Sequence, residues 1–391
     1  MDQWPTYDFT GPLMRLTTAG AARNFDGAIV GRIATESIPL ENRQEYIRLF
    51  PQGAKHSFDC TGYRAILSYG DFSTDRPVVD RLRETDHMNS GDVVVMEGGS
   101  GFVRSLYRPY EKHHSLFVTE RCSSNCLMCS QPPKDRDDIP ALLQRNDELI
   151  RLMDPAPKYL TITGGEPTLL GDGLIALLEQ LKDALPDTEL HMLTNGRTLA
   201  WPEYTQRIAG VNHLNLCLGV PLYSDCAGEH DYVVQAKGAF DQTVSGLHQA
   251  ARNGIRIEVR VVLHRLTIPR LTRLAEYIYR NLSFVEHIAL MGLEYVGYTP
   301  QNIEELWIDP FDYQDELDRA VSFLSVRGMA VSIYNHQLCV LRPSLWPFAQ
   351  KSISDWKNLY LPECEKCSAL AQCGGLFQWA VKKHSSHIHT L

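Results

Sequence analysis

The sequence has 391 residues, of which 44% are hydrophobic and 22% charged, so we expect two or three domains with large apolar cores. Its formal net charge of −9 weighs against a nucleic-acid partner, which would need a surface that neutralises phosphates. No apolar run has the length of a membrane helix and the start lacks a signal-peptide pattern, so we expect no membrane association and a cytoplasmic location.

Residues 1–112 are expected to form a β-rich or α+β domain. Short β-type runs at 28–30 and 92–96 alternate with Gly, Pro, Asp and Ser turns, and helices are expected at 42–50 and 76–84. Such a domain is either a cap or a holder of a substrate peptide, which would add a strand to an exposed sheet edge.

Three cysteines follow the short apolar run 116–118. Cys122, Cys126 and Cys129 are separated by three and then two residues, so their thiols can close around one metal centre on a loop. Structural zinc sites and complete iron–sulfur sites normally take four protein ligands, and this loop has no fourth Cys or His. A cuboidal iron–sulfur cluster on three cysteines would keep one iron open for a small ligand. The alternative is a zinc site or three buried thiols.

Strand-type and helix-type segments alternate after this loop. Expected strands cover 159–163, 191–194, 211–218, 255–263 and 285–291, and expected helices cover 171–184, 239–253, 267–282 and 312–326. Repeated strand–helix units imply a parallel sheet with right-handed crossovers, and ligands bind at the carboxyl ends of such strands. The predicted fold class is α/β, with the strand–helix units in one domain over 113–327 and a small domain over 328–391.

Polar and glycine residues stand where two of these strands end. Gly164, Gly165, Glu166 and Pro167 follow the first of them. The two glycines let the backbone come close to a ligand, and the proline fixes the turn. Asn195 precedes a glycine at the end of the next strand, which also favours a turn.

Two further positions have open interpretations. Arg260 lies mid-strand in an apolar run, where an unpaired charge is costly, so it either pairs with Glu258 or reaches a ligand inside the barrel. His230 and Asp231 form either a functional pair or part of a loop turn.

A second cysteine group lies near the end of the sequence. Cys364, Cys367 and Cys373 are separated by two and then five residues, and Cys339 lies upstream. Four thiols from two segments suit a closed tetrahedral or cubane site, and spacing alone does not separate zinc from 4Fe–4S. His336 is a less favoured alternative ligand, since a lone histidine at such a place is more often structural.

The polar segment 384–389 is expected to be a disordered tail, although it contains a His-x-Ser sequence. Seven of the ten cysteines fall in two metal-type groups, which indicates a reducing compartment rather than a disulfide framework.

The three-cysteine spacing followed by Gly-Gly-Glu-Pro at 164–167 resembles the radical S-adenosylmethionine (radical SAM) superfamily. The resemblance implies a partial (β/α)6 barrel and a 4Fe–4S cluster on Cys122, Cys126 and Cys129 that chelates SAM at its open iron. It also implies reductive cleavage of SAM to a 5′-deoxyadenosyl radical, with the cofactor supplying the difficult chemistry.

The same resemblance implies contacts between the protein and SAM. Gly-Gly-Glu-Pro would bind the amino group, Arg260 the carboxylate and Asn195 the ribose, while Met128 occupies a place near adenine or simply packs. The implied SAM-binding residues are therefore Met128, Gly164, Gly165, Glu166, Pro167, Asn195 and Arg260.

The cysteine spacing near the end resembles part of the SPASM/Twitch auxiliary-cluster domains. A full SPASM pattern has another cysteine where this chain has Phe377, so the resemblance implies a shortened, Twitch-like lobe with one second 4Fe–4S cluster. Its ligands would be Cys339, Cys364, Cys367 and Cys373.

Residues 129–133, Cys-Ser-Gln-Pro-Pro, together with the preceding β-rich region, resemble the C-type radical SAM maturase of the His-Xaa-Ser system. This implies modification of a peptide or a His-Xaa-Ser repeat protein, a second radical SAM maturase as a partner, and a flavodoxin- or ferredoxin-type electron donor. The alternatives are radical modification of tRNA or a small metabolite, and a non-catalytic, metal-stapled interaction protein. The substrate-reacting residue is unknown from the sequence.

Overall fold

The computed structural model describes residues 17–50, 59–83, 87–351 and 359–391. These divide into two compact units, here called unit 1 (within Met1–Ser115, with Ala141–Tyr159) and unit 2 (Leu116–Pro140 and Leu160–Leu391). The predicted α/β fold with a parallel sheet is confirmed. Within the described ranges, no helix combines the length and apolar character that a membrane crossing requires.

Unit 1 contains an eight-stranded sheet, counted over the described residues, in the order β1-β8-β7-β3-β4-β5-β6-β2. Its strands are β1 (Thr17–Ala19), β2 (Ala21–Arg23), β3 (Ala28–Ala34), β4 (Tyr46–Phe50), β5 (Ala65–Ser68), β6 (Val78–Asp80), β7 (Val93–Glu97) and β8 (Phe102–Tyr107). The expected β-rich character of this region is therefore present. Buried side chains such as Ile33, Ile47, Leu67 and Val94 form its core.

Both edges of this sheet come from one short segment. β1 pairs with β8 at one edge and β2 with β6 at the other, and only Gly20 separates β1 from β2. A Cβ at Gly20 would lie 2.2 Å from the Asp80 carbonyl oxygen, so glycine is needed where the segment crosses. Each edge strand has three residues, which leaves little edge for an added peptide strand.

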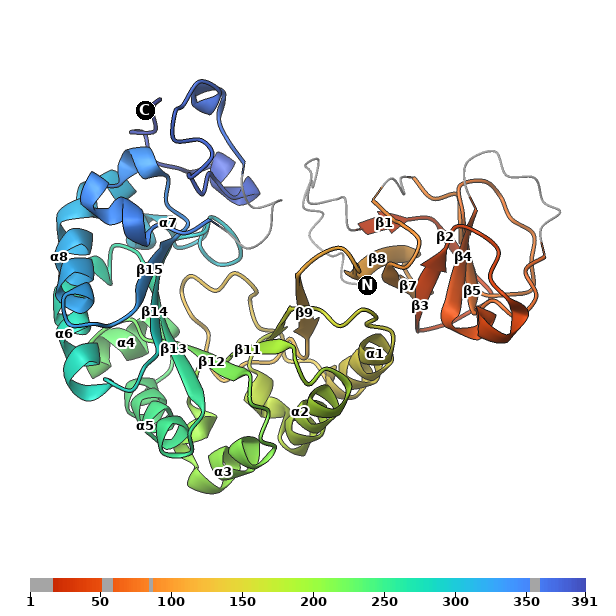
Figure 1. Cartoon of the computed structure of the whole chain (residues 1–391), viewed down its shortest axis with the longest axis horizontal. Helices are drawn as coiled ribbons and strands as arrows, with labels where there is room; N and C mark the ends of the chain where they lie inside the picture. Colours follow the sequence, from red (N-terminus) through yellow and green to blue (C-terminus); the bar gives the residue numbers. More distant parts are fainter. Residues whose placement is uncertain (1–16, 51–58, 84–86, 352–358) are drawn as a thin grey trace. The chain divides into compact units, whose positions relative to one another are not determined.

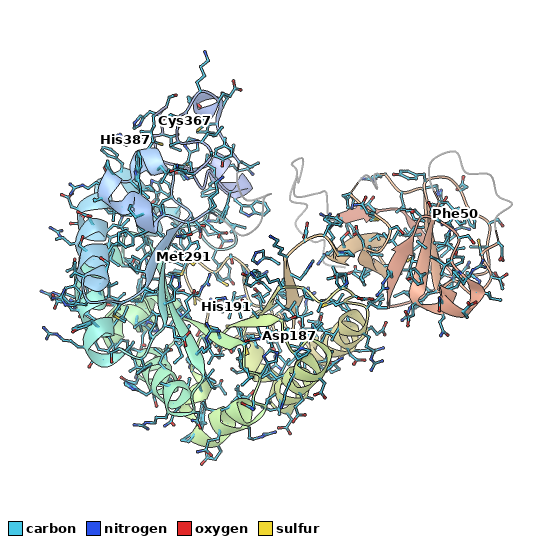
Figure 2. The ribbon with its side chains drawn as sticks, viewed as in Figure 1. Phe50, Asp187, His191, Met291, Cys367 and His387 are labelled. Atoms are coloured by element: carbon cyan, nitrogen blue, oxygen red, sulfur yellow. The ribbon has the colours of Figure 1, made fainter. Side chains whose placement is uncertain are left out.

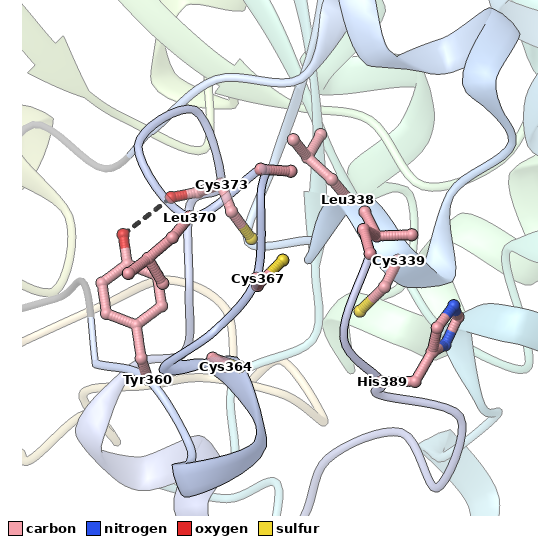
Figure 3. Close-up of a pocket in the computed structure, with 10 residues that line it drawn as sticks. Leu338, Cys339, Tyr360, Cys364, Cys367, Leu370, Cys373 and His389 are labelled. Carbon is pink, nitrogen blue, oxygen red and sulfur yellow. Dashed lines mark hydrogen bonds between the residues drawn. The ribbon is translucent and has the colours of Figure 1, made fainter.

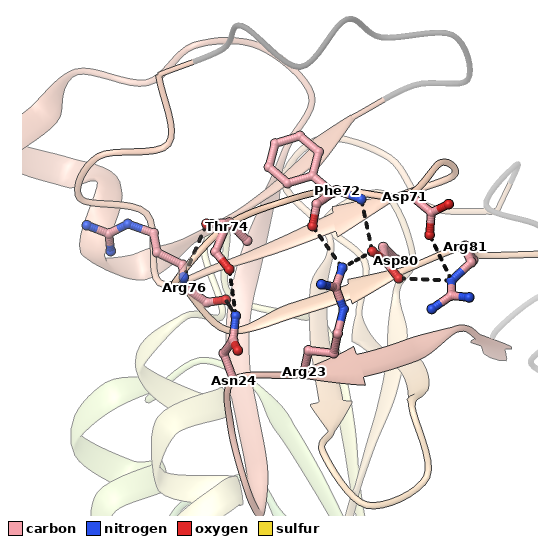
Figure 4. A network of polar contacts seen from close by, with 8 residues as sticks. All are labelled: Arg23, Asn24, Asp71, Phe72, Thr74, Arg76, Asp80 and Arg81. Atoms are coloured by element: carbon pink, nitrogen blue, oxygen red, sulfur yellow. Dashed lines mark hydrogen bonds and ion pairs between the residues drawn. The ribbon is translucent and has the colours of Figure 1, made fainter.

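A buried carboxylate fastens β2 to β6 and to the loop before β6 (Figure 4). Asp80 is fully buried, forms an ion pair with Arg23 and accepts a hydrogen bond from the Phe72 backbone N–H at 2.9 Å. Arg23 also donates to the Phe72 carbonyl oxygen at 2.8 Å. A buried charge is tolerated only when it is paired, so this network holds the edge strand β2 against β6.

The two helices expected in unit 1 are wrong. Residues 42–50 form the end of a 3₁₀ turn, η2 (Leu40–Glu45), followed by β4. The run Tyr46–Phe50 is rich in aromatic and branched side chains, and pairing with β3 and β5 on its two sides decides in favour of a strand. The segment 76–83 contains β6 instead of a helix, and residue 84 lies outside the described residues.

Unit 2 is built on a sheet with the order β15-β14-β13-β12-β11-β10-β9, counted over the described residues. Its strands are β9 (His113–Phe117, which begins in unit 1), β10 (Tyr159–Thr163), β11 (Glu189–Leu193), β12 (Leu216–Pro221), β13 (Arg256–Leu263), β14 (His287–Gly292) and β15 (Val331–Tyr334). Each pairing from β11 to β15 is parallel. β9 and β15 form the two ends of the strand order, so the sheet is a partial barrel that stays open.

Helices follow the strands in sequence. They are α1 (Ile139–Arg151), α2 (Asp172–Ala184), α3 (Pro202–Gly210), α4 (Ala227–Val234), α5 (Ala239–Arg252), α6 (Leu271–Asn281), α7 (Ile303–Leu306) and α8 (Gln314–Ser325). Figure 1 shows α2, α3, α5, α6 and α8 along the convex side of the strands. The expected strand at 211–218 begins five residues late, because α3 and its capping turn extend to Val211.

The strands of unit 2 alternate between two environments. In β13, Ile257, Val259 and Val261 are buried on the helix side, whereas Glu258 and Arg260 point to the concave side. Figure 2 shows His191 and Met291 on the same concave side. Charged and polar side chains thus line the interior of the partial barrel, which is where the ligand of such a fold binds.

Candidate active site

The loop that carries Cys122, Cys126 and Cys129 starts where β9 ends, and its backbone lies against the end of β10. Three hydrogen bonds join the two segments: Val118 N to Thr163 O (2.9 Å), Gly165 N to Thr119 O (2.6 Å) and Glu166 N to Arg121 O (2.8 Å). The cysteines therefore leave the sheet at the carboxyl ends of its strands, as the sequence predicts.

The two glycines make this close contact sterically feasible. A Cβ at Gly165 would lie 2.0 Å from the Arg121 carbonyl oxygen, and one at Gly164 would lie 2.5 Å from that of Thr119. Gly164 also has a φ of +154°, which side chains rarely adopt. The sequence predicts that both glycines let the backbone come close to a ligand. In the structure, their nearest neighbour is the backbone of the cysteine loop.

The three thiols lie within electrostatic range of one another. Burial raises the pKa of Cys126 strongly, and the charges of Cys129 and Cys122 raise it further. Burial likewise raises the pKa of Cys122 to about 11, with smaller contributions from Glu166 and Cys129. Three such thiolates repel each other unless a cation binds them, and a metal ion deprotonates coordinating thiols outright. The donor set therefore fits a metal cluster.

Other parts of unit 2 hold the loop in place. The backbone N–H groups of Asn125 and Leu127 donate to the carbonyls of α4 residues Val234 and Val233, each at 3.0 Å. Met128 is buried in an apolar cluster with Tyr223, Val233 and Leu306. Its side chain packs, which is the second of its two interpretations.

Glu166 is a fully buried carboxylate that joins two of the loops at the site. Its Oε1 accepts hydrogen bonds from the Thr168 backbone N–H (2.9 Å), the Thr168 hydroxyl (2.7 Å) and the Thr194 hydroxyl (2.6 Å). Its Oε2 accepts from the Asn195 backbone N–H at 2.7 Å. Pro167 follows as the first residue of a buried 3₁₀ turn, η3 (Pro167–Leu170). Glu166 thus positions the loop after β11 relative to the loop after β10.

Asn195 lies next to the cysteine loop. Its side-chain amide donates to the Ser123 hydroxyl at 2.9 Å and lies 4.0 Å from the Cys122 sulfur. Its Oδ1 accepts from the Arg197 backbone N–H at 3.0 Å, as expected of a turn residue. The structure therefore gives Asn195 a turn role and also brings it to the cysteines.

Arg260 is paired with Glu258 inside the barrel, at 2.7 Å between Nη1 and Oε1. Glu258 also contacts His287 Nδ1 at 2.7 Å and His191 Nε2 at 3.5 Å. Burial alone would raise the pKa of Glu258, but the hydrogen bond with His287 and the charge of Arg260 lower it to about 2. Arg260 Nη2 donates to the Met291 sulfur at 3.1 Å. A guanidinium has five N–H donors, and the contacts with Glu258 and Met291 use two of them.

The pair His230 and Asp231 has a structural role. His230 Nδ1 accepts a hydrogen bond from the Tyr223 backbone N–H at 3.2 Å, and burial lowers its pKa to about 4. Asp231 accepts from the backbone N–H groups of Gly238 (2.5 Å) and Phe240 (2.8 Å) at the start of α5.

Tyr223 is a site residue that the sequence analysis missed. It is buried among the loops, and burial raises its pKa well above the usual value, with further increases from Cys126 and Cys129 and a decrease from Arg260. It therefore lies within electrostatic range of the cysteines and of the Arg260 guanidinium. Its position just after β12, at the carboxyl end of a strand, is the sequence signal that could have identified it.

The second cysteine group converges in a different part of unit 2 (Figure 3). Cys339, Cys364, Cys367 and Cys373 line one apolar cavity together with His389 and five further residues: Leu338, Tyr360, Ala369, Leu370 and Leu391. Burial raises the pKa of Cys339, and the charges of Cys373 and Cys364 raise it further. The structure thus brings all four sequence-predicted thiols together.

Local hydrogen bonds fix both segments of this cysteine group. The Tyr360 hydroxyl donates to the Cys373 carbonyl oxygen at 2.8 Å, and Gly375 N lies 3.5 Å from the Cys373 sulfur. Cys339 lies in a 3₁₀ turn, η7 (Leu338–Val340), whose first carbonyl accepts from Trp346 Nε1 at 3.0 Å.

In the part of the chain that the structure describes, no three Cys, His, Asp or Glu side chains close around a single point as ligands of one metal ion do.

His336 has the structural role that the sequence favours, whereas the expectation of a disordered tail at 384–389 is wrong. His336 is buried away from the cavity lining, with Nε2 2.7 Å from the Tyr313 hydroxyl and Nδ1 2.8 Å from the Tyr334 carbonyl oxygen, so both ring nitrogens are occupied. The segment 384–389 is not a disordered tail, because Ser385 is buried and donates to Asp309 Oδ1 at 2.5 Å.

Comparisons with known proteins agree on the central part of the chain. Residues 116–278 match the family model of the Radical SAM superfamily. GTP 3′,8-cyclase from Petrotoga mobilis (strain DSM 10674 / SJ95) is 26% identical over 143 residues, which are 35% of this chain and 42% of that protein. GTP 3′,8-cyclase from Nautilia profundicola (strain ATCC BAA-1463 / DSM 18972 / AmH) is 29% identical over 152 residues, 37% of this chain and 45% of that protein. The chain spans less than half the length of these two relatives.

A solved structure shares the fold. The crystal structure of Streptococcus suis SuiB bound to S-adenosylmethionine is similar with a TM-score of 0.50 and 16% sequence identity, over 64% of this chain and 55% of that chain.

Proposed function

We propose that Cys122, Cys126 and Cys129 hold a 4Fe–4S cluster and that the chain binds SAM beside it, because residues 116–278 match the family model of the Radical SAM superfamily. The observation that carries this proposal is that three thiols within electrostatic range of one another share one loop, which is fixed at the carboxyl ends of the strands. When bound, the cluster supplies the electron that cleaves SAM reductively to a 5′-deoxyadenosyl radical. SuiB, which shares the fold, is bound to SAM in its crystal structure.

The surrounding residues would position SAM. The N–H groups of Gly165 and Glu166 already donate to the cysteine loop, so it is the carbonyl oxygens at 164–167 that would accept hydrogen bonds from the SAM amino group. Arg260 keeps donors for the SAM carboxylate although Glu258 already holds it. Asn195 lies beside Cys122, where a ribose hydroxyl could bind, and Met128 would contribute its backbone to adenine because its side chain packs.

We further propose that Cys339, Cys364, Cys367 and Cys373 hold one auxiliary 4Fe–4S cluster, in line with a Twitch-like lobe at 328–391. Their common cavity supports this, since a closed site needs four protein ligands. After anaerobic reconstitution, we expect about eight irons per chain, two 4Fe–4S units, and loss of about half of them in Cys364→Ala. Iron for one cluster together with stoichiometric zinc would contradict the second cluster but not the first.

For the substrate, we propose a peptide or a His-Xaa-Ser repeat protein, which the chain would modify together with a second maturase. The sequence Cys-Ser-Gln-Pro-Pro at 129–133 and the β-rich unit 1 support it. The test incubates the reconstituted chain, a reducing electron donor and the partner maturase with a His-Xaa-Ser repeat peptide. A change in peptide mass in step with SAM consumption is expected. An unchanged mass with both clusters intact would exclude this substrate while leaving the SAM chemistry standing.

A small-molecule substrate is the second candidate, because the curated relatives reported above are GTP 3′,8-cyclases. The same reconstituted chain is therefore incubated with GTP in place of the peptide. Formation of a new nucleotide product with an unmodified peptide would favour this candidate over peptide maturation.

A further inference from the structure

The auxiliary cavity has more metal-binding side chains than one centre needs. Cys339, Cys364, Cys367, Cys373 and His389 all line it, whereas a tetrahedral zinc site or a 4Fe–4S cubane takes four protein ligands. At least one of the five side chains is therefore left over when the site is occupied.

The His389 ring is prepared for metal binding through Nε2. Its Nδ1 lies 2.8 Å from the His387 carbonyl oxygen, an acceptor that can only receive a hydrogen, so Nδ1 carries the proton and Nε2 keeps the lone pair. Histidine ligands of metals generally have this arrangement, in which the other ring nitrogen donates to a carbonyl or carboxylate and fixes the tautomer.

The segment around His389 is held on both sides. Upstream, Ser385 and Ser386 donate to Asp309 at 2.5 and 3.1 Å, and the His387 ring stacks on Phe311 with 4.0 Å between centroids. Downstream, the Thr390 hydroxyl donates to the Glu363 carbonyl at 2.6 Å, and Ser368 N donates to Leu391 O at 3.1 Å. Contacts outside the cavity therefore already order the backbone around His389, so metal binding loses little further conformational entropy there.

The geometry also indicates which side chains compete. Cys364, Cys367 and Cys373 come from one ten-residue loop, whereas Cys339 and His389 come from two other segments. These two lie next to each other at the cavity (Figure 3), and the His389 backbone is close enough to lower the pKa of the Cys339 thiol against the effect of burial. Either side chain therefore approaches the fourth position from the same side of the cavity.

We infer that Cys339 and His389 are alternative ligands for the fourth position of the auxiliary centre, while the three loop cysteines hold the other positions. The inference rests on the proposed function in one respect, namely that this site binds a metal centre. Exchange of a thiolate for a neutral imidazole removes one negative charge from the ligand set. Histidine in place of cysteine raises the reduction potential of an iron–sulfur cluster, so the exchange would change how readily this centre accepts an electron.

The test compares four variants after anaerobic reconstitution: Cys339→Ala, His389→Ala, the double variant, and His384→Ala as a control that alters a histidine outside the cavity lining. Iron and zinc per chain are counted, and pulsed electron paramagnetic resonance without added SAM detects nitrogen bound to iron. We expect both single variants and the control to keep the wild-type metal content and the double variant to lose about half, as for Cys364→Ala. Cys339→Ala should show a nitrogen coupling that the double variant lacks.

Two results would overturn the inference. Cys339→Ala alone could lose as much metal as Cys364→Ala, or it could keep its iron without nitrogen coupling. A wild-type chain with iron for one cluster, unchanged by Cys364→Ala, would instead show that the auxiliary centre itself is missing, and the inference would fail together with that part of the proposed function.

Discussion

Glu166→Gln tests whether the Gly-Gly-Glu-Pro motif acts by holding the loops of the site together. Three of the four hydrogen bonds to Glu166 end on Oε1 and one, from the Asn195 backbone, ends on Oε2. A glutamine can keep its oxygen at the first position, but its NH₂ group then faces the Asn195 N–H, donor against donor. The substitution therefore breaks the connection between the loops after β10 and β11 without changing side-chain volume.

The size of the effect follows from burial. Glu166 is fully buried, and each unpaired buried donor costs about 1–3 kcal/mol, so two such donors cost about 2–6 kcal/mol. Burying a neutral amide instead of a carboxylate recovers part of this cost, and we expect a net loss of about 2–4 kcal/mol in the free energy of unfolding. Displacement of Asn195 should also reduce SAM cleavage.

Urea denaturation of the metal-free chain measures this change, with Glu203→Gln on the exposed face of α3 as the matched control. The control should stay within about 0.5 kcal/mol of the wild type. If Glu166→Gln were as stable as Glu203→Gln and formed 5′-deoxyadenosine at the wild-type rate, the role assigned to this carboxylate would be refuted.

Three further outcomes are expected. Tyr223→Phe removes a hydroxyl within electrostatic range of Cys126 and Arg260, so it should keep the iron content but slow SAM cleavage about tenfold, or about 1.4 kcal/mol in the barrier; an unchanged rate would remove Tyr223 from the site. Asp80→Asn should lower the free energy of unfolding of unit 1 by about 1–3 kcal/mol in thermal denaturation, while Asp71→Asn, at an exposed pair, should change it little. The depressed pKa of Glu258 means that its stabilisation is complete above pH 4.5 and is lost as the pH falls toward 2, about 3 kcal/mol in total. Denaturation of the metal-free chain at pH 3 and 6 should show this loss, and Glu258→Gln should not.

The barrel could be predicted from the sequence because its strands are continuous apolar runs bounded by turns. β13 is the clearest example, since its expected bounds 255–263 differ by one residue from Arg256–Leu263. β4 shows where such reasoning fails. Its five residues fit a helix or a strand, and the deciding factor is pairing with β3 and β5, which come from other parts of the sequence.

At the site, the cysteines could be identified by spacing, but their surroundings could not. Glu166 was expected to contact a ligand, and only the folded structure shows its carboxylate turned toward Thr168 and Thr194. His389 stands sixteen residues after Cys373 in a polar stretch, so no periodicity connects it to the cysteines. The hydrogen bonds of Asp309 with Ser385 and Ser386 help to hold the segment that carries His389 beside the auxiliary cavity. These hydrogen bonds form only in the tertiary structure.

The most direct measurement for the central claim is the yield of 5′-deoxyadenosine from SAM under reducing, anaerobic conditions, in the triple variant Cys122→Ala, Cys126→Ala, Cys129→Ala. The matched control is Cys60→Ala with Cys226→Ala, two cysteines that belong to neither group. We predict that the triple variant forms no 5′-deoxyadenosine while keeping the iron of the auxiliary site, and that the control forms it at the wild-type rate. Formation at the wild-type rate by the triple variant would contradict the assignment of the SAM-cleaving cluster to this loop.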